Sequence, residues 1–256
     1  MADSAPARPI FEIRDLAKSY GPKRVLNELS FDIMAGESLV VLGRSGSGKS
    51  VLLRQLNGLE KPDAGSVTFD GTVISTLSER QLTPVRRRIA MLFQGGALFD
   101  SLTIGENVGF PLAEHSKLSA AEIRERAEHK LELVGLTGVI DKMPSALSGG
   151  MRKRAALARS LALDPEVILF DEPTTGLDPV SSASIAQLIR DTQRETRTTS
   201  VIVTHDLPLA RKAGDRLGFL DDGKFRFLGS WQEADSADDP VISGFLAGRV
   251  EEAAVA

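Results

Sequence analysis

The chain has 256 residues, of which 42% are hydrophobic and 26% are charged, and its formal net charge is -4. This balance is typical of a globular domain that needs no disulfide or structural metal, and the lack of cysteine excludes a disulfide framework and a thiolate zinc site. The small acidic excess argues against broad nucleic-acid binding, which usually requires a basic excess. No run approaches the roughly 18 apolar residues that cross a bilayer. We therefore expect a soluble chain, so another polypeptide would supply any membrane-spanning helices.

The first elements are predicted from the alternation of apolar and polar residues and from the turns that interrupt it. Met1–Pro9 is expected to be a loose tail, and the stretch from Phe11 to Ile33 alternates like half-buried strands. The continuous apolar run Leu39–Leu42 predicts a strand buried on both faces, and a helix is expected over Lys49–Leu59. Next come a hairpin over Val67–Ile74 around Asp70-Gly71, a helix over Glu79–Arg88 with Pro84 at a break or near its start, and a strand over Ile89–Phe93.

Helices and buried strands alternate in the second half. Ser119 can cap a helix over Ser119–Val134, because Glu122 stands three residues later and apolar residues follow at helical spacing. The basic run Arg152-Lys153-Arg154 reads as a solvated helix face. The remaining elements are helices over Met151–Ala162 and Ser181–Arg194, strands over Val167–Phe170 and Val201–Thr204, and a hairpin of Leu217–Leu220 and Lys224–Leu228.

This order of elements predicts an α/β fold with a parallel-sheet core, an antiparallel edge layer and a helical insertion at about residues 95–163. We assign residues 10–234 to one domain, with an N-terminal tail at 1–9 and a C-terminal tail at 235–256. The apolar residues from Val241 to Val250 predict a short amphipathic helix that needs a surface to pack on.

A glycine-rich loop separates the buried strand from the helix that follows it. It fits the pattern G-x-x-x-x-G-K-[ST] and reads Gly43-Arg44-Ser45-Gly46-Ser47-Gly48-Lys49-Ser50. Glycines let backbone N–H groups approach phosphate oxygens, and the helix adds its N-terminal dipole. Lys49 can reach the β- and γ-phosphates, and the Ser50 hydroxyl can ligate Mg²⁺. We assign this loop and Val51 to nucleotide binding, since the flanking strand and helix argue against a chance glycine-rich loop.

Polar residues follow three further strands. Asp171 and Glu172 end an apolar strand, where Asp171 can hold Mg²⁺ and Glu172 can act on the attacking water as general base or orienting group. The alternative is a strand that merely ends in solvent. His205 could hydrogen-bond a γ-phosphate, and the amide of Gln94 could bind the metal or the water. Each would be a weak signal alone, because a lone histidine is more often structural.

Leu147-Ser148-Gly149-Gly150-Met151, followed by a basic helix and the Asp171-Glu172 strand, resembles the signature of ATP-binding-cassette (ABC) ATPases. The family's other motifs occur in the same order: Tyr20 where an aromatic ring stacks on adenine, Gln94 in the Q-loop, Gly176-Leu177-Asp178 in the D-loop and His205 in the H-loop. The resemblance extends from about Phe11 to Leu228. It implies a P-loop NTPase cassette with a RecA-like core, an antiparallel β subdomain and an α-helical subdomain, which hydrolyses ATP with Mg²⁺. Met151 replaces the family's usual Gln, but no backbone donor is lost, so we expect activity to survive.

The resemblance also implies a homodimer around two ATP molecules. Ser148 can cap the helix behind it, and Gly149 and Gly150 expose backbone N–H groups that form an anion site. The family pattern implies that this site and Asp178 serve the ATP held by a second copy, in a symmetric two-fold assembly.

The stretch Phe93–Thr103, the segment Glu106–Leu112 and Met151 resemble the ATPases of Mla/Mce-type lipid transporters. That resemblance implies an MlaE-like integral membrane permease, a position on the cytoplasmic face of the inner membrane, and phospholipid as cargo between the inner and outer membranes. It also implies small accessory subunits and periplasmic lipid-binding subunits, and no nucleic-acid partner. Leu98 and Phe99, if exposed, would dock the permease, although they could equally be core. The C-terminal tail is a candidate for docking on the partner ATPase or an accessory subunit.

Three alternatives stay open. The chain could be a soluble ABC ATPase acting on DNA or the ribosome, or an ABC importer or exporter of another small molecule. It could also be a P-loop kinase or an ATP-dependent switch, although the signature and His205 argue against a kinase and Glu172 argues against a pure switch.

Overall fold

The computed structural model describes residues 8–248. Most of the expected N-terminal tail therefore lies outside the described residues, and Pro9 already belongs to the first strand.

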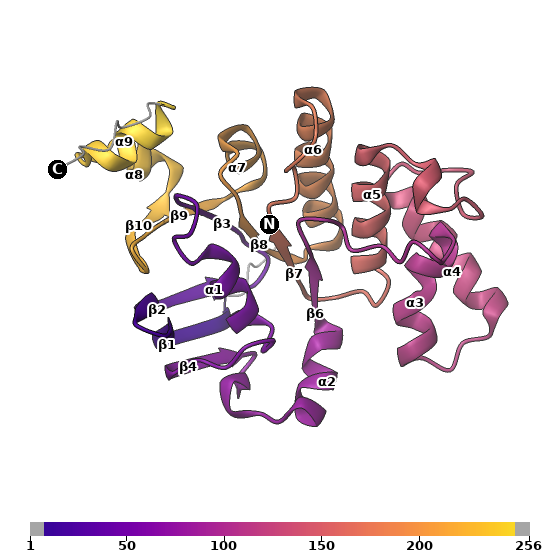
Figure 1. Ribbon diagram of the computed structural model, residues 1–256, viewed down its shortest axis with the longest axis horizontal. Coiled ribbons are helices and arrows are strands. Elements are labelled where there is room, and N and C mark those ends of the chain that lie inside the picture. The colour runs from indigo at the N-terminus through magenta and orange to yellow at the C-terminus, as the bar shows by residue number, and fades with distance from the viewer. Residues whose placement is uncertain (1–7, 249–256) are drawn as a thin grey trace, which may run out of the picture.

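Within the described residues the strands form two sheets (Figure 1). The antiparallel sheet has the order β2-β1-β4-β5, and the second sheet has the order β10-β9-β3-β8-β7-β6, in which all pairs are parallel except β10 with β9. Both predicted hairpins and the predicted parallel core are confirmed. The strands are β1 (Pro9–Tyr20), β2 (Lys23–Met34), β3 (Ser38–Leu42), β4 (Ala64–Phe69), β5 (Thr72–Val73), β6 (Ile89–Leu92), β7 (Val167–Asp171), β8 (Thr199–Val203), β9 (Arg216–Asp221) and β10 (Lys224–Ser230).

Helices α3, α4 and α5 form a group beside the β6 edge of the parallel sheet, on the right in Figure 1. Helix α4 begins as predicted, because Ser119 and Glu122 form a capping box. No helix among residues 8–248 has both the length and the apolar content to span a bilayer. The helices are α1 (Lys49–Leu56), α2 (Glu79–Arg88), α3 (Ile104–His115), α4 (Ala120–Leu133), α5 (Gly149–Ser160), α6 (Pro179–Thr196), α7 (Leu207–Ala213), α8 (Trp231–Asp235) and α9 (Pro240–Leu246).

The prediction for Pro84 is wrong, because this residue lies in the interior of α2. Proline there removes one backbone N–H donor to Arg80. The helix survives because Leu82 and Val85 are buried in the core and a capping box of Ser78 and Gln81 starts it.

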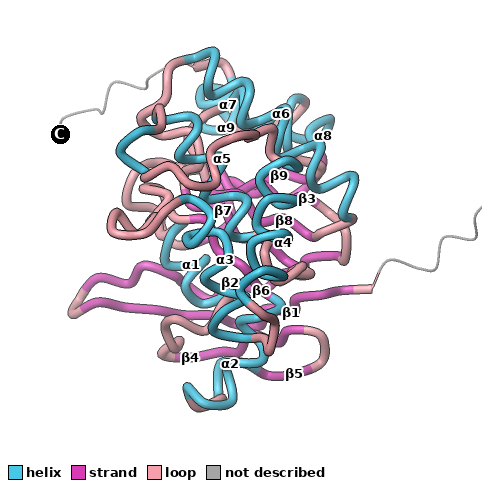
Figure 2. The backbone as a smooth tube through the Cα atoms, turned by 90° about the vertical axis from the view of Figure 1, so that its right-hand side faces the viewer, coloured by secondary structure: helices cyan, strands magenta, loops and turns pink. Residues whose placement is uncertain are grey.

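Successive side chains of β3 belong alternately to two separate clusters of the hydrophobic core. Leu39 and Val41 belong to the cluster between the parallel sheet, α1 and the antiparallel sheet, whereas Val40 and Leu42 belong to the cluster beneath the helices. Successive strand residues face opposite sides of a sheet, so a strand with both faces covered must be apolar throughout. Figure 2 shows the antiparallel strands below the parallel sheet and helices α6, α7, α8 and α9 above it.

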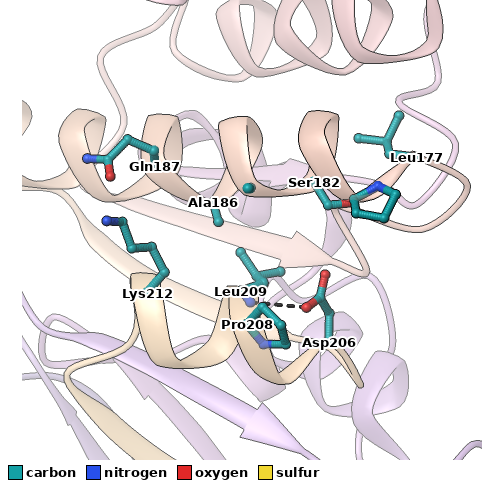
Figure 3. Close-up of a pocket in the computed structure, with 10 residues that line it drawn as sticks. Leu177, Ser182, Ala186, Gln187, Asp206, Pro208, Leu209 and Lys212 are labelled. Atoms are coloured by element: carbon teal, nitrogen blue, oxygen red, sulfur yellow. Dashed lines mark hydrogen bonds between the residues drawn. The ribbon is translucent and has the colours of Figure 1, made fainter.

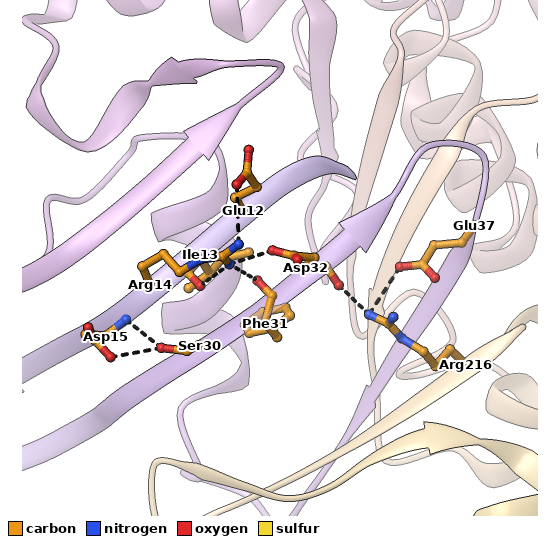
Figure 4. A network of polar contacts seen from close by, with 9 residues as sticks. All are labelled: Glu12, Ile13, Arg14, Asp15, Ser30, Phe31, Asp32, Glu37 and Arg216. Atoms are coloured by element: carbon orange, nitrogen blue, oxygen red, sulfur yellow. Dashed lines mark hydrogen bonds and ion pairs between the residues drawn. The ribbon is translucent and has the colours of Figure 1, made fainter. Parts of the chain in front are cut away.

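Ion pairs and hydrogen bonds join the two sheets (Figure 4). Arg216 of β9 donates to the backbone oxygen of Asp32 at 2.5 Å and lies 3.3 Å from the Glu37 carboxylate. The Asp32 side chain in turn accepts a hydrogen bond from Arg14 of β1 at 2.5 Å. The network ties the β1–β2 hairpin to the end of the sheet where the parallel strands begin.

The C-terminal segment is not a separate tail over the described residues. Helix α9 forms as expected, but Ile242 is only 2% exposed and the Phe245 ring packs edge-on against Phe219 of β9, with ring centroids 5.0 Å apart. The expectation that this helix needs a surface to pack on is met by its own domain, since Ile242 is buried and Phe245 packs on Phe219, whereas docking of this segment on another chain stays a prediction. Val250 lies outside the described residues.

Candidate functional site

Most of the predicted loop and strand-end residues line one cavity of about 640 Å³ at the carboxyl ends of the parallel strands, whereas Ser47 and Asp171 are not among its lining residues. Parallel strands bring residues that are distant in sequence to the same edge of a sheet, where α/β proteins bind their ligands. The predicted residues in its wall are Gly43, Arg44, Ser45, Gly46, Gly48, Lys49, Ser50, Val51, Gln94, Glu172 and His205.

The loop before α1 has the backbone geometry of an anion cradle. Gly46 and Gly48 have φ angles of +80° and +103°, which residues with a Cβ rarely adopt. A Cβ at Gly48 would come within 2.7 Å of the Val25 carbonyl oxygen, whereas a Cβ at Gly46 would meet no heavy atom within 4 Å. Gly48 is therefore required by close packing, and Gly46 leaves open space where a phosphate could approach the backbone.

Lys49 directs its ammonium group along this loop. Its Nζ donates to the backbone oxygens of Gly43 at 2.8 Å and Arg44 at 3.0 Å. Burial lowers the pKa of Lys49, and the nearby carboxylates of Glu172 and Asp171 oppose that shift. A polyphosphate would add further negative charge and so favour the charged ammonium.

Ser50 and Asp171 lie within direct reach of each other. The Ser50 hydroxyl donates to Oδ1 of Asp171 at 2.8 Å, which joins the start of α1 to the end of β7. Burial raises the pKa of Asp171, and the Ser50 hydrogen bond partly offsets this. Hydroxyl and carboxylate oxygens are ligands that suit Mg²⁺. One hydroxyl and one carboxylate suit an ion such as Mg²⁺ that takes its other ligands from phosphate and water. Among residues 8–248 no group of three His, Cys, Asp or Glu side chains could hold a metal.

The side chains of Glu172 and His205 are in contact beyond the ends of β7 and β8. Oε2 of Glu172 lies 2.8 Å from Nδ1 of His205. The backbone N–H of Glu172 donates to the backbone oxygen of Val203 at 3.0 Å. Glu172 adopts a φ of +48°, an unusual conformation for a residue with a side chain. The structure thus holds a mostly buried carboxylate beside a largely exposed imidazole in the cavity wall.

Helix α5 holds the loop around Gln94, which sequence reasoning missed. Lys153 donates to the backbone oxygen of Gln94, and Arg159 donates to the oxygens of Gly96 and Ala97 at 3.0 and 2.7 Å. The interpretation of the run Arg152–Arg154 as a solvated face holds for Arg152, which is exposed, and is wrong for Lys153. Lys153 is buried, and its neighbours bond the Leu147 and Val134 oxygens. Lys153 shares a helix face with Ala156 and Leu157, and that apolar spacing was the available signal.

The signature residues stand outside this cavity. Ser148 caps α5 by accepting the Met151 N–H at 3.3 Å, and Asp178 caps α6. A Cβ at Gly149 would lie 3.4 Å from Leu177, so the signature packs on the D-loop of the same chain. Ser148, Gly149, Gly150 and Asp178 are not among the residues that line the cavity.

Tyr20 also stands outside the lining of the cavity. Its hydroxyl donates to Glu60 at 2.5 Å, and Lys18 Nζ lies 5.7 Å from the ring centroid. Its ring is exposed at the turn between β1 and β2.

Three lining residues were not predicted: Val25, Thr175 and Phe245. Val25 and Phe245 come from β2 and α9, far from the loop in sequence, and no local pattern marks them. Thr175 follows Glu172 by three residues, inside the motif region, and its backbone N–H donates to the backbone oxygen of Glu172 at 3.2 Å.

A second cavity of about 620 Å³ lies between α6 and α7 (Figure 3). Its wall is mainly hydrocarbon, with Lys212 and Gln187 at one end and Asp206 at the other. Asp206 caps α7 through the Leu209 N–H and accepts a hydrogen bond from Thr174 at 2.8 Å. None of the residues of the glycine-rich loop reaches it.

Known proteins resemble this chain in sequence and in fold. Residues 26–175 match the family model described as ABC transporter. The chain is 45% identical over 244 residues to "Probable ribonucleotide transport ATP-binding protein mkl" of Mycobacterium leprae, covering 95% of this chain and 70% of that protein. It is 39% identical over 239 residues to "Intermembrane phospholipid transport system ATP-binding protein MlaF" of Escherichia coli K12, covering 93% and 89%. The dimeric post-hydrolysis state of the ATP-binding cassette MJ0796 bound to ADP and Pi has a TM-score of 0.80 at 35% identity, covering 86% and 98%.

Proposed function

The chain belongs to the ABC transporter family and is an ATPase, and from that premise we propose that it drives phospholipid transport through a membrane permease. The observation that carries the mechanism is one cavity lined by Lys49, Ser50, Glu172 and His205, with Asp171 bonded to Ser50 behind its wall. These are the parts that phosphoryl transfer to water requires: a phosphate cradle, a metal ligand set and a group that acts on water.

Each residue has a distinct role in this proposal. The loop N–H groups and Lys49 bind the β- and γ-phosphates. Glu172 orients the attacking water and takes its proton, and His205 holds the Glu172 carboxylate and can donate to the γ-phosphate. Ser50 and Asp171 would hold Mg²⁺, with Gln94 near it, and the ion when bound would neutralise charge on the phosphates.

A second copy of the chain would complete the site. Ser148, Gly149, Gly150 and Asp178 offer helix N-termini and backbone donors, yet they do not line the cavity of their own chain. A two-fold arrangement would bring the signature of one protomer to the nucleotide of the other. The solved relative MJ0796 is a dimer, which supports this arrangement.

A surface groove offers a place for the permease. Phe93, Phe99 and Phe110 are 41%, 44% and 39% exposed, and the rings of Phe99 and Phe110 lie 5.0 Å apart. From the sequence, Leu98 and Phe99 could each be exposed or part of the core. In the structure Leu98 packs against the core, whereas Phe99 is exposed. A neighbouring cavity of about 270 Å³ joins Phe93 to Arg87, His115 and Arg159. Exposed aromatic rings next to cations suit an amphipathic helix of a partner.

Two cargo classes compete, and one observation favours each. The match to MlaF covers 89% of that protein, which supports phospholipid. The match to mkl has the higher identity, which supports a ribonucleotide, although the chain spans only 70% of that relative. We favour phospholipid because the Phe93–Thr103 stretch and Met151 independently resemble lipid-transport ATPases. The chain would then act at the cytoplasmic face of the inner membrane, with MlaE-like permease, accessory and periplasmic lipid-binding subunits as partners.

The test is purification of the chain in mild detergent with its bound proteins and lipids. We expect a multi-spanning permease and phospholipid to co-purify, and the reconstituted complex to move fluorescent phospholipid only with ATP. The Glu172→Gln complex is the control and should move none. ATP-driven ribonucleotide uptake would replace the lipid cargo, and co-purification with DNA or ribosomes instead of a permease would reject the transport proposal.

A further inference from the structure

An aromatic residue of the C-terminal helix lines the same cavity as the phosphate loop. Phe245 of α9 shares this wall with Gly43, Arg44, Ser45 and His205. Among the described residues that line the cavity, it has the largest apolar side chain. It is half-buried, so its ring is covered on one side and reaches the cavity on the other.

The structure holds this ring in place from two directions. Phe245 packs edge-on against Phe219, with an interplanar angle of 73°, and Phe219 is fully buried beside Leu42, the residue that precedes the phosphate loop. Asp239 caps α9 by accepting the Val241 and Ile242 N–H groups, and Arg226 of β10 donates to its carboxylate at 2.6 Å. The helix is thus fastened to the last hairpin of the sheet.

That hairpin touches the phosphate loop directly. A Cβ at Gly43 would come within 2.3 Å of the Leu220 oxygen, so the loop starts in contact with the end of β9. The Asn27 N–H donates to the Gly223 oxygen at 2.8 Å, which brings the β9–β10 turn against β2, next to Val25, another residue that lines the cavity. Movement of the loop on nucleotide binding would therefore meet both the hairpin and Phe245.

We propose that Phe245 is a nucleotide-positioning residue whose ring seals the loop end of the ATP cavity and couples α9 to nucleotide occupancy. An apolar wall beside Arg44 and Ser45 keeps water from the phosphates, and charge interactions strengthen where water is excluded. This inference rests on ATP binding in this cavity, as argued above. It assigns a binding role to a segment that lies beyond the family motifs.

The test compares three full-length variants by ATP KM, kcat and melting temperature. Phe245→Ala should raise KM about three- to tenfold with kcat within about twofold. Phe245→Leu should restore KM because it keeps an apolar wall. Leu246→Ala is the matched control, since Leu246 packs on the same core without lining the cavity, and its KM should stay within about twofold of wild type. Equal KM values for the two alanine variants, or a change confined to kcat, would overturn the proposal.

Hydrogen exchange gives a second reading in which Phe245 itself is left unchanged. ATP should slow exchange of amides in Ser243–Gly248, and Lys49→Ala should abolish that protection. If wild type shows no protection while Lys49→Ala still loses ATP binding, the role of Phe245 is rejected and the assignment of the cavity stands. Retained ATP binding in Lys49→Ala would instead reject the assignment of the cavity.

Discussion

Nδ1 of His205 lies 2.8 Å from Oε2 of Glu172, although the two residues end different strands. The same carboxylate oxygen lies 3.3 Å from the Thr204 hydroxyl and 3.4 Å from the His205 N–H. Two hydrogen bonds and the contact with His205 Nδ1 hold the carboxylate in one orientation at the cavity wall. A carboxylate held in this way is placed to orient a water molecule and to take its proton.

Glu172→Gln should retain ATP binding and slow hydrolysis by about a hundredfold or more, because an amide cannot accept the proton of the attacking water. Single-turnover hydrolysis, measured beside equilibrium ATP binding, checks both parts. Glu125→Gln on the exposed side of α4 is the matched control and should behave as wild type. Normal turnover by Glu172→Gln would remove this residue from the mechanism.

Lys49→Ala should lose most of its ATP affinity, since its ammonium group is a positive charge in the cavity wall that can reach the terminal phosphates. Isothermal titration with ATP and Mg²⁺ measures the loss. A melting curve is needed beside it, because Lys49 also bonds the Gly43 and Arg44 oxygens. Lys224→Ala changes an exposed lysine as the control. A folded Lys49→Ala protein with wild-type affinity would contradict the cradle assignment.

Ser148→Arg should abolish ATP hydrolysis while the same chain still binds ATP, because Ser148 does not line its own cavity. Mixing this variant with Lys49→Ala should restore activity, since one of the two shared sites in the mixed dimer then has an intact loop and an intact signature. Ser145→Arg, three residues earlier and exposed, should leave activity intact. If the mixture stays inactive while mixed dimers form, the two-chain site is wrong.

Phe99→Asp should weaken co-purification with the permease and leave ATP binding unchanged, because it places a charge on the exposed aromatic surface away from the cavity. The pull-down is scored by permease recovered per ATPase chain. Val73→Asp serves as the control at an exposed apolar residue of the antiparallel sheet. Equal recovery for the two variants would place the docking surface elsewhere.

Glu37→Gln should become more stable relative to wild type as the pH rises from about 4.5 toward 7. Burial raises the pKa of Glu37, despite opposing contributions from the Met34 N–H and Arg216. A carboxyl whose pKa is raised on folding stabilises the fold below its unfolded pKa, and this contribution is lost as the pH rises through the folded pKa. Glutamine does not ionise, so it avoids that loss.

Urea unfolding of both proteins at several pH values measures the difference in free energy. The exposed Glu125→Gln variant controls for the general effect of removing a charge. A stability difference that is flat with pH, or that falls as pH rises, would show that the Arg216 pair outweighs burial at Glu37.

The parallel core and most of the cavity residues could be predicted because each depends on contiguous sequence. A strand covered on both faces must be apolar at every position, as in Leu39–Leu42, and a backbone that turns toward phosphate requires glycine at positions such as Gly46. Helix α3 was not placed, although Thr103 and Glu106 form a capping box. Two glycines and Pro111 obscured its helical spacing.

The sequence alone determined which chemistry the chain can perform, because phosphate cradling and metal ligation need particular residue types at short, regular spacings. Only the tertiary structure decided that Lys153 is buried against the Gln94 loop, that α9 packs on its own domain, and that Phe245 reaches the ATP cavity. These features depend on contacts between segments that are distant in the chain, and such contacts leave no periodic pattern in either segment. Burial and proximity are therefore set by how the sheet brings its strand ends together.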